Sequence, residues 1–442
     1  MSLSSLSFIG IYFPIILICY HLPIKGIKNL ILLLFSLGLY ALGNFQYLFL
    51  LIFSICLNYL LVRLSFKRKN KAYKAFAVFI DALILLGFKY VNSILGFVQS
   101  EISVAFPLGL SYFTFKEISY VVDCREDDGS SFIDAALYIA NFLTILAGPL
   151  TKFKDELSDS KAQRVSDYEK GFERVFSGLF KKIIIADSLK LLVDSCFVSN
   201  SLSVLMAWSG GVAYSLQLYF DFAGYSDIAI GFGYFFGYHL CENFNLPYLA
   251  TSISDFWKRW HLSLTSWFTT YIYIPLGGSR VKSSARHLFN LFVVWLVTGI
   301  WHGSKLTFIL WAMIYFVLQA LEKYTALADK LQKIHLNRLY TLFVVVIEWV
   351  IFRSESLRSA LSYLSMMFGL AGNGLFNSSD LLSLSYYKLP LLLAILMSFG
   401  AFEWLKKEKY QKLYQIVLLA LFVLCLVIMI GRGYSAPLYA GF

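Results

Sequence analysis

Long apolar segments follow one another along this 442-residue chain, and they constrain its fold more than any other feature. In Ile27–Tyr40 and Leu413–Ile430, for example, apolar residues continue with little interruption. The strands of a transmembrane barrel would instead alternate polar and apolar residues over about ten positions. The chain has 58% apolar and 15% charged residues, whereas about a quarter of the residues in a soluble domain are charged. The sequence therefore predicts an all-α polytopic membrane protein.

The apolar segments predict about 11 to 12 transmembrane helices, together with re-entrant or interfacial helices. The expected spans lie at roughly 7–22, 28–43, 46–64, 75–98, 183–198, 204–222, 287–302, 305–322, 338–353, 386–404 and 413–430. Between them, Ala105–Val122 and Phe132–Leu150 leave room for only one full crossing, so we expect the other to be re-entrant. Residues 221–280 are too polar to span and too aromatic for a solvated loop. Short amphipathic or re-entrant helices are expected there.

Basic residues gather in short loops between the apolar segments and contribute to a net charge of +11. Arg63–Lys74 holds six Lys and Arg residues and no acid, and Lys406–Lys412 is a second basic cluster. Basic loops of this length stay on the cytosolic side of a membrane. The orientation of the chain in the membrane thus explains its positive net charge. The sequence lacks the stripe of basic residues interleaved with aromatic ones that is expected for nucleic-acid binding. The six cysteines are scattered without metal-ligand spacing, so no metal site is expected.

Two of the six histidines stand in unusual surroundings. His302 follows Gly-Ile-Trp at the end of a long apolar segment, and His261 ends the stretch Asp-Phe-Trp-Lys-Arg-Trp-His. An ionisable side chain inside a membrane segment is costly and therefore indicates function. An imidazole is also suited to take a proton from a hydroxyl near neutral pH. From the residues alone, a core histidine bonded to a neighbouring carbonyl is an equal alternative for His302.

A series of motifs gives the chain a more specific signature. In chain order they are Pro107–Phe115, Ala147–Pro149, Asp221–Gly231, Glu242–Tyr248, Asp255–Leu264, Tyr273–Arg280 and Gly299–Gly303, with weaker matches at Phe352–Arg353 and at the C-terminal phenylalanine. In this combination the chain resembles the bacterial membrane-bound O-acyltransferase family, in particular its branch of alginate and peptidoglycan O-acetylation membrane proteins. The resemblance covers about half the chain. It implies a funnel-shaped helical fold, with N-terminal transmembrane helices (1–104), a catalytic core (105–322) and C-terminal transmembrane helices (323–442).

The resemblance also implies roles for the two histidines. His302 matches the catalytic histidine of the family, and His261 matches its second functional histidine. An acyl group would pass from a cytosolic thioester, such as acetyl-coenzyme A, to an acceptor outside, with no bound cofactor and no metal. We expect Trp301 and Trp260 to exclude water from the site, and Gly303 to leave room for a substrate beside the imidazole.

Basic residues near one cytoplasmic face are expected to bind the donor. Lys258, Arg259 and Arg280 lie in these motifs near Asp255, and coenzyme A carries phosphates that such cations pair with. A role in topology alone is the alternative. In this branch a second, extracytoplasmic esterase-like acetyltransferase commonly places the group on the polysaccharide. The expected partners are that protein, a cell-envelope polysaccharide, an acyl-coenzyme A or acyl carrier, and the bilayer of a bacterial cytoplasmic (inner) membrane.

O-acetylation of an extracytoplasmic cell-envelope polysaccharide is thus the leading function predicted for the chain. One alternative is D-alanyl transfer from a carrier protein to teichoic acids, in a sister branch that shares the Trp-His motifs, although Ile274–Arg280 resembles the acetylation branch. Another, of a different class, is a transporter or scaffold without enzymatic activity. Thr269 and Thr270 replace the Arg-Asp pair that is usual in the family, so any charge contact of that pair is missing or supplied elsewhere.

The clusters Arg63–Lys74 and Lys406–Lys412 should both face the cytosol, with both termini outside and an even number of crossings. We expect a single cysteine placed at Lys69 or Lys409, in a chain without its native cysteines, to resist an impermeant thiol reagent in intact cells. The same cysteine should react once the membrane is opened. Strong labelling of either position in intact cells would contradict this orientation.

Overall fold

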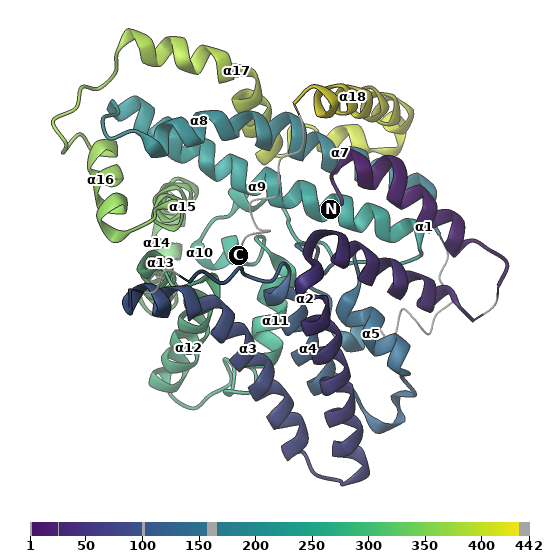
Figure 1. The fold of residues 1–442 in the computed structure, drawn as a ribbon. Coiled ribbons are helices and arrows are strands. Elements are labelled where there is room, and N and C mark those ends of the chain that lie inside the picture. Colours follow the sequence, from purple (N-terminus) through teal and green to yellow (C-terminus); the bar gives the residue numbers. More distant parts are fainter. Residues whose placement is uncertain (1, 25, 100–101, 157–165, 433–442) are drawn as a thin grey trace. The chain divides into compact units, whose positions relative to one another are not determined.

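Helices are the only regular elements among the residues that the computed structural model describes, which are 2–24, 26–99, 102–156 and 166–432. Figure 1 shows these helices coloured along the chain. The chain divides into two units. Unit 1 comprises Met1–Gly178, Tyr225–Glu242 and Met429–Phe442, and unit 2 comprises Leu179–Gly224 and Asn243–Ile428. The predicted all-α class is confirmed.

Unit 1 contains two long helices together with several shorter ones. Its elements are η1 (Phe8–Tyr12), α1 (Phe13–Tyr20), α2 (Lys28–Lys67), α3 (Ala72–Phe97), α4 (Leu110–Asp123), η2 (Glu126–Asp128), α5 (Phe132–Ala140) and most of α7 (Tyr168–Leu179). Helix α2 is interrupted at Asn44, whose φ of −160° and ψ of 46° are not helical. This break falls between the expected spans 28–43 and 46–64, so the two predicted helices meet there.

Polar side chains join the long helices of unit 1. Asn58 of α2 donates to Asp81 Oδ1 of α3 at 2.9 Å, and both residues are buried. Lys116 of α4 donates to Thr144 Oγ1 at 2.6 Å, and its ammonium nitrogen lies 3.9 Å from Glu156 Oε2. A lone polar group is costly in a membrane interior, so Asn58 and Asp81 fix which faces of α2 and α3 meet, and Lys116 ties α4 to the chain that follows α5.

Residues 102–109, directly before α4, form no helix or strand. Gly109 has a φ of +75°, and a Cβ at this position would lie 2.5 Å from the carbonyl oxygen of Ile145. Glycine is the residue that fits both the left-handed conformation and the close approach. The helices that follow are short, with 14 residues in α4 and nine in α5. Which of the two stretches crosses the membrane stays a prediction.

Unit 2 contains the remaining helices, among them α12 and α13, which pack along one another (Figure 1). Its elements are η3 (Phe180–Ala186), α8 (Asp187–Val198), the first part of α9 (Val204–Phe235), η4 (Pro247–Leu249), α10 (Ile253–Trp257), α11 (Leu262–Phe268), η5 (Thr269–Tyr273), α12 (Ser284–His302), α13 (Leu306–Thr325), α14 (Leu327–Lys333), α15 (Asn337–Arg353), α16 (Leu357–Met367), α17 (Ser378–Ser398), η6 (Glu403–Lys406), η7 (Glu408–Tyr410) and α18 (Gln411–Arg432).

The expectation that residues 221–280 form only short helices is wrong for the first part of this stretch. Residues 221–235 continue α9, and short helices begin only after it, with η4, α10 and α11. Lys182 supplies the physical reason, because its ammonium group lies 2.7 Å from both Asp187 and Asp221. Lys182 and Asp221 are almost fully buried. Asp221 is one of the acidic residues that made the stretch look too polar for a long helix. Its charge is neutralised by Lys182 of η3.

Five helices of the described chain are long and apolar enough to span a membrane by length and composition. They are Lys28–Lys67, Ala72–Phe97, Leu306–Thr325, Ser378–Ser398 and Glu408–Gly431. These helices support a multi-pass membrane protein, as predicted. The larger number of crossings, about 11 to 12, stays a prediction.

Replacing Lys182 by Met should destabilise the protein strongly, because Asp187 and Asp221 would keep their charges and lose their shared cation. Removing one partner of a buried ion pair costs about 3–5 kcal/mol. We expect a clearly lower Tm for the detergent-purified variant. The control is Lys406→Met, which breaks a half-exposed pair with Glu403 and should cost less than about 1 kcal/mol. Equal shifts in Tm for the two variants would contradict this account.

Candidate active site

Helix α12 carries His302 on its last turn. The hydroxyl of Ser283 caps the first turn by accepting the backbone N–H of Arg286 at 3.2 Å. The helix ends at His302 because Gly303 takes a φ of +142°, a conformation that residues with a side chain rarely adopt. The next helix, α13, begins at Leu306. The imidazole is therefore held on a fixed turn directly before a change in chain direction.

His302 lies among aromatic rings and is 5% exposed. Its ring centroid is 4.6 Å from that of Trp301 and 5.1 Å from that of Trp311. Phe352 and Phe308 follow at 5.0 and 5.9 Å. Rings on this many sides exclude water, and a hydrogen bond to the imidazole is stronger in such surroundings than in water.

His261 occupies the turn between α10 and α11. It directly precedes α11 and has a φ of +47° and a ψ of 53°, in the left-handed region. The side chain is buried, and its ring meets the ring of Phe222 edge-on at 4.6 Å. A residue other than glycine keeps this conformation only where its surroundings enforce it, and such positions cluster at functional sites.

Asn243 determines which nitrogen of His261 carries the proton. Asn243 Oδ1 lies 3.0 Å from His261 Nδ1, and it accepts the hydroxyl of Ser263 at 2.9 Å and the backbone N–H of Ser263 at 3.3 Å. Because a backbone N–H can only donate, this atom of Asn243 is its oxygen, and Nδ1 of His261 bears the proton. The lone pair then lies on Nε2. Burial lowers the pKa of His261 to about 3, so the ring is neutral at neutral pH.

Aromatic contacts connect the two histidines within unit 2. Trp260 directly precedes His261 and lies 4.9 Å from Trp349, measured between ring centroids. Trp349 contacts Phe352 at 5.6 Å, and Phe352 contacts His302 at 5.0 Å. The structure thus brings both predicted histidines and their neighbouring tryptophans into one buried aromatic cluster.

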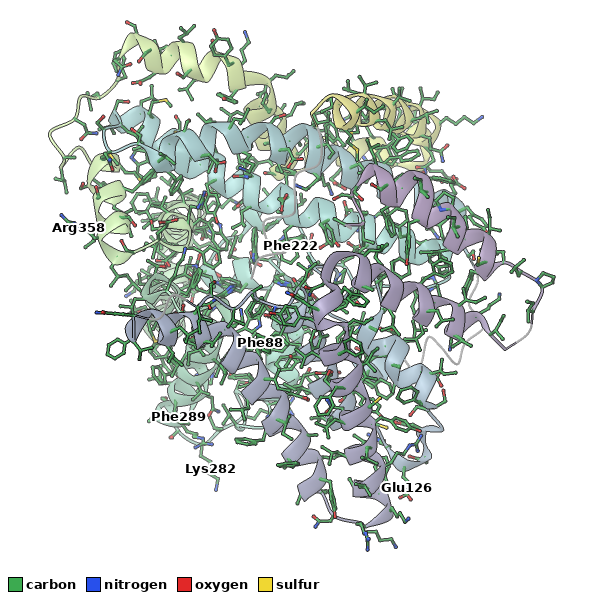
Figure 2. The ribbon with its side chains drawn as sticks, in the orientation of Figure 1. Phe88, Glu126, Phe222, Lys282, Phe289 and Arg358 are labelled. Carbon is green, nitrogen blue, oxygen red and sulfur yellow. The ribbon has the colours of Figure 1, made fainter. Side chains whose placement is uncertain are left out.

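The charged residues predicted to bind the donor have different surroundings in the structure, and their role in donor binding stays a prediction. Arg259 donates to Asp255 Oδ1 at 2.9 Å and to the carbonyl of Asn245 at 3.4 Å. These bonds hold the segment that leads into His261. Arg280 is exposed between η5 and α12, and Figure 2 shows its neighbour Lys282 pointing away from the helices.

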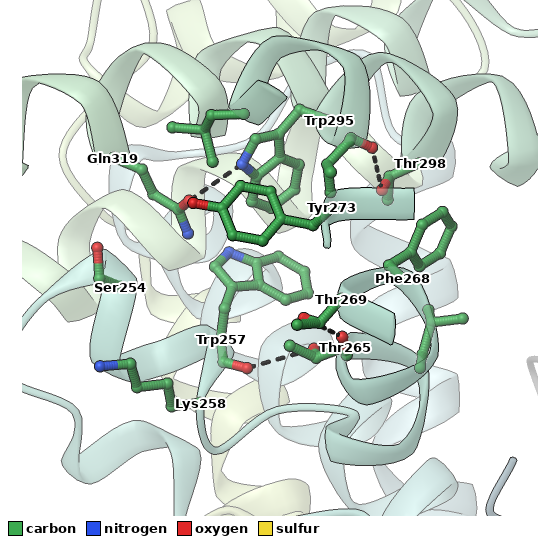
Figure 3. Close-up of a pocket in the computed structure, with 13 residues that line it drawn as sticks. Ser254, Trp257, Lys258, Thr265, Phe268, Thr269, Tyr273, Trp295, Thr298 and Gln319 are labelled. Carbon is green, nitrogen blue, oxygen red and sulfur yellow. Dashed lines mark hydrogen bonds between the residues drawn. The ribbon is translucent and has the colours of Figure 1, made fainter. Parts of the chain in front are cut away.

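Lys258 lies at a pocket of about 310 Å³ formed by residues of α10, α11, η5, α12 and α13 (Figure 3). The rings of Trp257 and Trp295 are part of its wall. Neither His261 nor His302 is among the residues that line it. The structure therefore places Lys258 at a hollow that is distinct from the surroundings of the histidines.

Asn243, Trp311 and Phe352 contact the histidines and were not predicted from the sequence to do so. Asn243 belongs to the motif Glu242–Tyr248, and this membership could have identified it from the sequence as a candidate site residue. Phe352 stands in Phe352–Arg353, a weaker match to the motifs of the family. Trp311 carries no such signal, because a ring in an apolar segment is equally consistent with ordinary packing.

Within the described residues, no group of three or more His, Cys, Asp or Glu side chains is arranged to hold a metal ion. The expectation that the chain works without a bound metal or cofactor stays a prediction.

Comparison with known proteins identifies the architecture. The profile of the membrane-bound O-acyltransferase family, MBOAT, matches residues 97–364, a range that includes both histidines and the pocket. The chain belongs to this family. The resemblance noted from the motifs is confirmed, and so is the enzyme class, an O-acyltransferase.

Relatives of the chain fall into acetyl and D-alanyl transfer enzymes by name. A probable alginate O-acetylase AlgI of Pseudomonas syringae pv. tomato is 35% identical over 424 residues, covering 90% of this chain and 82% of the relative. The peptidoglycan O-acetyltransferase of Helicobacter pylori is 34% identical over 422 residues, covering 83% and 79%. The teichoic acid D-alanyltransferase of Bacillus subtilis is 28% identical over 260 residues, covering 54% and 65%.

Asn243→Leu should reduce acyl transfer by about 10²-fold or more, since a functional imidazole held in the wrong tautomer loses activity on this scale or above. Asn243→Asp keeps an oxygen that accepts from Ser263 and from His261, so it should retain far more activity. The measurement is acyl transfer by membranes that contain equal amounts of each variant, judged by immunoblot. If both variants lost activity equally, Asn243 would not act through the tautomer of His261.

Proposed function

We propose that this membrane O-acyltransferase passes an acetyl group from a cytosolic thioester, across the bacterial cytoplasmic membrane, to an extracytoplasmic cell-envelope polysaccharide. Two relatives named for acetyl transfer to alginate and to peptidoglycan align over most of their length, which supports this function. The observation that carries the proposal is the imidazole of His302, held on the last turn of α12 inside an aromatic enclosure.

His302 is the general base in this mechanism. Its imidazole takes the proton of an acceptor hydroxyl while the hydroxyl oxygen forms a bond to the thioester carbonyl carbon. The carbon–sulfur bond then breaks, and the thiolate leaves with the donor. Trp301, Trp311 and Phe352 exclude water, which would otherwise hydrolyse the thioester. Gly303, with a φ of +142°, ends α12 directly after the ring, and Phe308 occupies the space that a Cβ would take there.

His261 positions a substrate group. Because its Nδ1–H is given to Asn243, the neutral ring offers a lone pair on Nε2 and no second N–H. It can therefore accept a hydrogen bond from a substrate hydroxyl or amide, but it cannot donate one to an oxyanion. Stabilisation of the oxyanion is therefore not the role that we assign to His261.

Arg280 is the residue that we assign to the phosphates of the donor, because its guanidinium is exposed beside the predicted cytosolic end of α12. Arg259 acts indirectly, through the bonds to Asp255 and Asn245 that hold the segment before His261. The acetyl thioester is a co-substrate in this mechanism, and acetyl-coenzyme A and an acetylated carrier both supply the same reactive bond.

In this proposal an extracytoplasmic esterase-like protein supplies the acceptor hydroxyl. The acetyl ester formed on it is then broken by a hydroxyl of the polysaccharide, which takes the acetyl group and frees the hydroxyl of the partner. D-alanyl transfer to teichoic acids is the second candidate, since an enzyme named for it is related to this chain. The alignment with that enzyme covers 54% of the chain, whereas the alginate O-acetylase aligns with 90%. Acetylation is therefore the favoured chemistry.

His302→Gln is the variant that tests the proposed function, since glutamine keeps a hydrogen-bonding side chain and cannot act as the base. Loss of a general base costs about 10²–10⁴-fold in rate. We expect acetylation of the envelope polysaccharide to fall by at least the lower factor, at unchanged membrane abundance. His335→Gln, at an exposed histidine, is the matched control and should acetylate normally. Normal acetylation by His302→Gln would remove His302 from the chemistry.

A further inference from the structure

The pocket at Lys258 has a polar end and an apolar end. In Figure 3 the side chains of Lys258 and Gln319 lie at one side of the view, and those of Phe268 and Thr298 lie at the other. Its volume of about 310 Å³ falls in the range of roughly 300–1,000 Å³ that is usual for sites of small organic ligands. A hollow of this kind suits an amphiphilic molecule.

The threonines in the wall do not make the pocket polar. Thr265 donates to the carbonyl of Trp257 at 3.3 Å, and Thr269 donates to the carbonyl of Thr265 at 2.7 Å (Figure 3). Thr298 donates to the carbonyl of Val294 at 2.7 Å. A hydroxyl that already donates its proton to a backbone carbonyl cannot donate that proton to a ligand. The wall therefore acts as an apolar surface.

Hydrogen-bond donors remain at the polar end. Trp295 Nε1 donates to Gln319 Oε1 at 3.1 Å, which leaves the amide nitrogen of Gln319 to donate elsewhere. The buried Nε1–H of Trp257 has no hydrogen-bond partner in the part of the chain that the structure describes. The exposed ammonium of Lys258 adds a positive charge. A ligand that fits must bring oxygen acceptors and a negative charge to this end.

Lys258 lies near the end of a candidate membrane span. The backbone N–H groups of Ile253 and Ser254, at the start of α10, donate to the carboxylate of Glu322 at 2.6 and 2.9 Å. Glu322 belongs to the last turn of α13, which ends at Thr325. Since α10 has only five residues, Lys258 is close to that end, where helices meet the lipid head groups.

Aromatic rings separate the pocket from His302. The ring of Trp257 lies 5.7 Å from that of Trp311, and Trp311 in turn lies 5.1 Å from His302. Phe268, in the wall, contacts Trp301 at 6.4 Å, and Trp301 contacts His302 at 4.6 Å. A donor thioester would have to place its carbonyl carbon beside His302. A ligand other than the donor therefore fits the pocket better.

We propose that this pocket binds a membrane phospholipid, with one acyl chain against the apolar wall and the phosphate on Lys258. Phosphates at a membrane surface attract lysine side chains, and the ester carbonyls of the lipid can accept the N–H groups of Trp257 and Gln319. The bilayer around the chain supplies this ligand. The lipid fastens α10 and α11, and with them the turn that holds His261, to α12 and α13. Its binding does not require the acetyl-transfer activity.

The test is binding of phosphatidylglycerol to the purified full-length protein in detergent, followed by the rise in Tm as the lipid is added. Lys258→Gln should bind about fivefold more weakly, the factor that corresponds to ~1 kcal/mol for one basic residue at an anionic lipid surface. Lys282→Gln, at an exposed lysine outside the pocket, is the matched control and should bind like the parent protein. Thr298→Phe fills the pocket and should abolish the rise in Tm while leaving Lys258 in place.

Equal binding by the parent protein and by both Lys258→Gln and Thr298→Phe would overturn the proposal, because the lipid would then bind elsewhere. A rise in Tm that depends on Lys258 and is produced by coenzyme A but not by phosphatidylglycerol would also overturn it, and would make the pocket a donor site. Because Tm reports binding directly, these outcomes do not depend on whether acetyl transfer is detected.

Discussion

A charged side chain buried among membrane helices needs a partner from another element, because lipid offers it none. Much of this structure follows from that constraint. Lys182 bridges Asp187 and Asp221, and it thereby allows α9 to continue as a helix through a polar stretch. Asn58 bonds to Asp81 and ties α2 to α3. Polar residues that weaken each segment alone thus determine which helix faces meet.

The same constraint shapes the two histidines differently. Asn243 accepts the hydrogen bond from Nδ1–H of His261, so the ring is fixed in one tautomer and has its lone pair on Nε2. His302 is surrounded by the rings of Trp301, Trp311 and Phe352, which remove water and leave the chemistry to the imidazole. A hydrogen bond fixes the orientation of His261, which suits this residue to orient a substrate. Aromatic rings keep water away from His302, which suits that residue to accept a proton.

The sequence predicted the helices well, since length and continuous hydropathy determine them. It even placed the break in α2 at Asn44. It failed at residues 221–235, where Asp221 pairs with Lys182 and Asp227 pairs with Arg174. Both cations lie far away in sequence, so these pairs cannot be read from a local window. Both histidines and the adjacent Trp301 and Trp260 were recognised by their motifs, whereas the neighbours that other elements supply were not. Asn243 and Phe352 matter only through contacts that the fold creates.

The central claim is that acyl transfer depends on His302 and crosses the membrane. The direct measurement uses proteoliposomes that contain the purified chain and its extracytoplasmic partner, with the acceptor polysaccharide sealed inside and a radiolabelled acetyl thioester added outside. For the chains whose basic loops face outward, the account predicts label on the enclosed polysaccharide, and about 10²-fold less or lower still with His302→Gln. Label that accumulates equally with the variant, or polysaccharide that is acetylated only when donor and acceptor share one side, would contradict it.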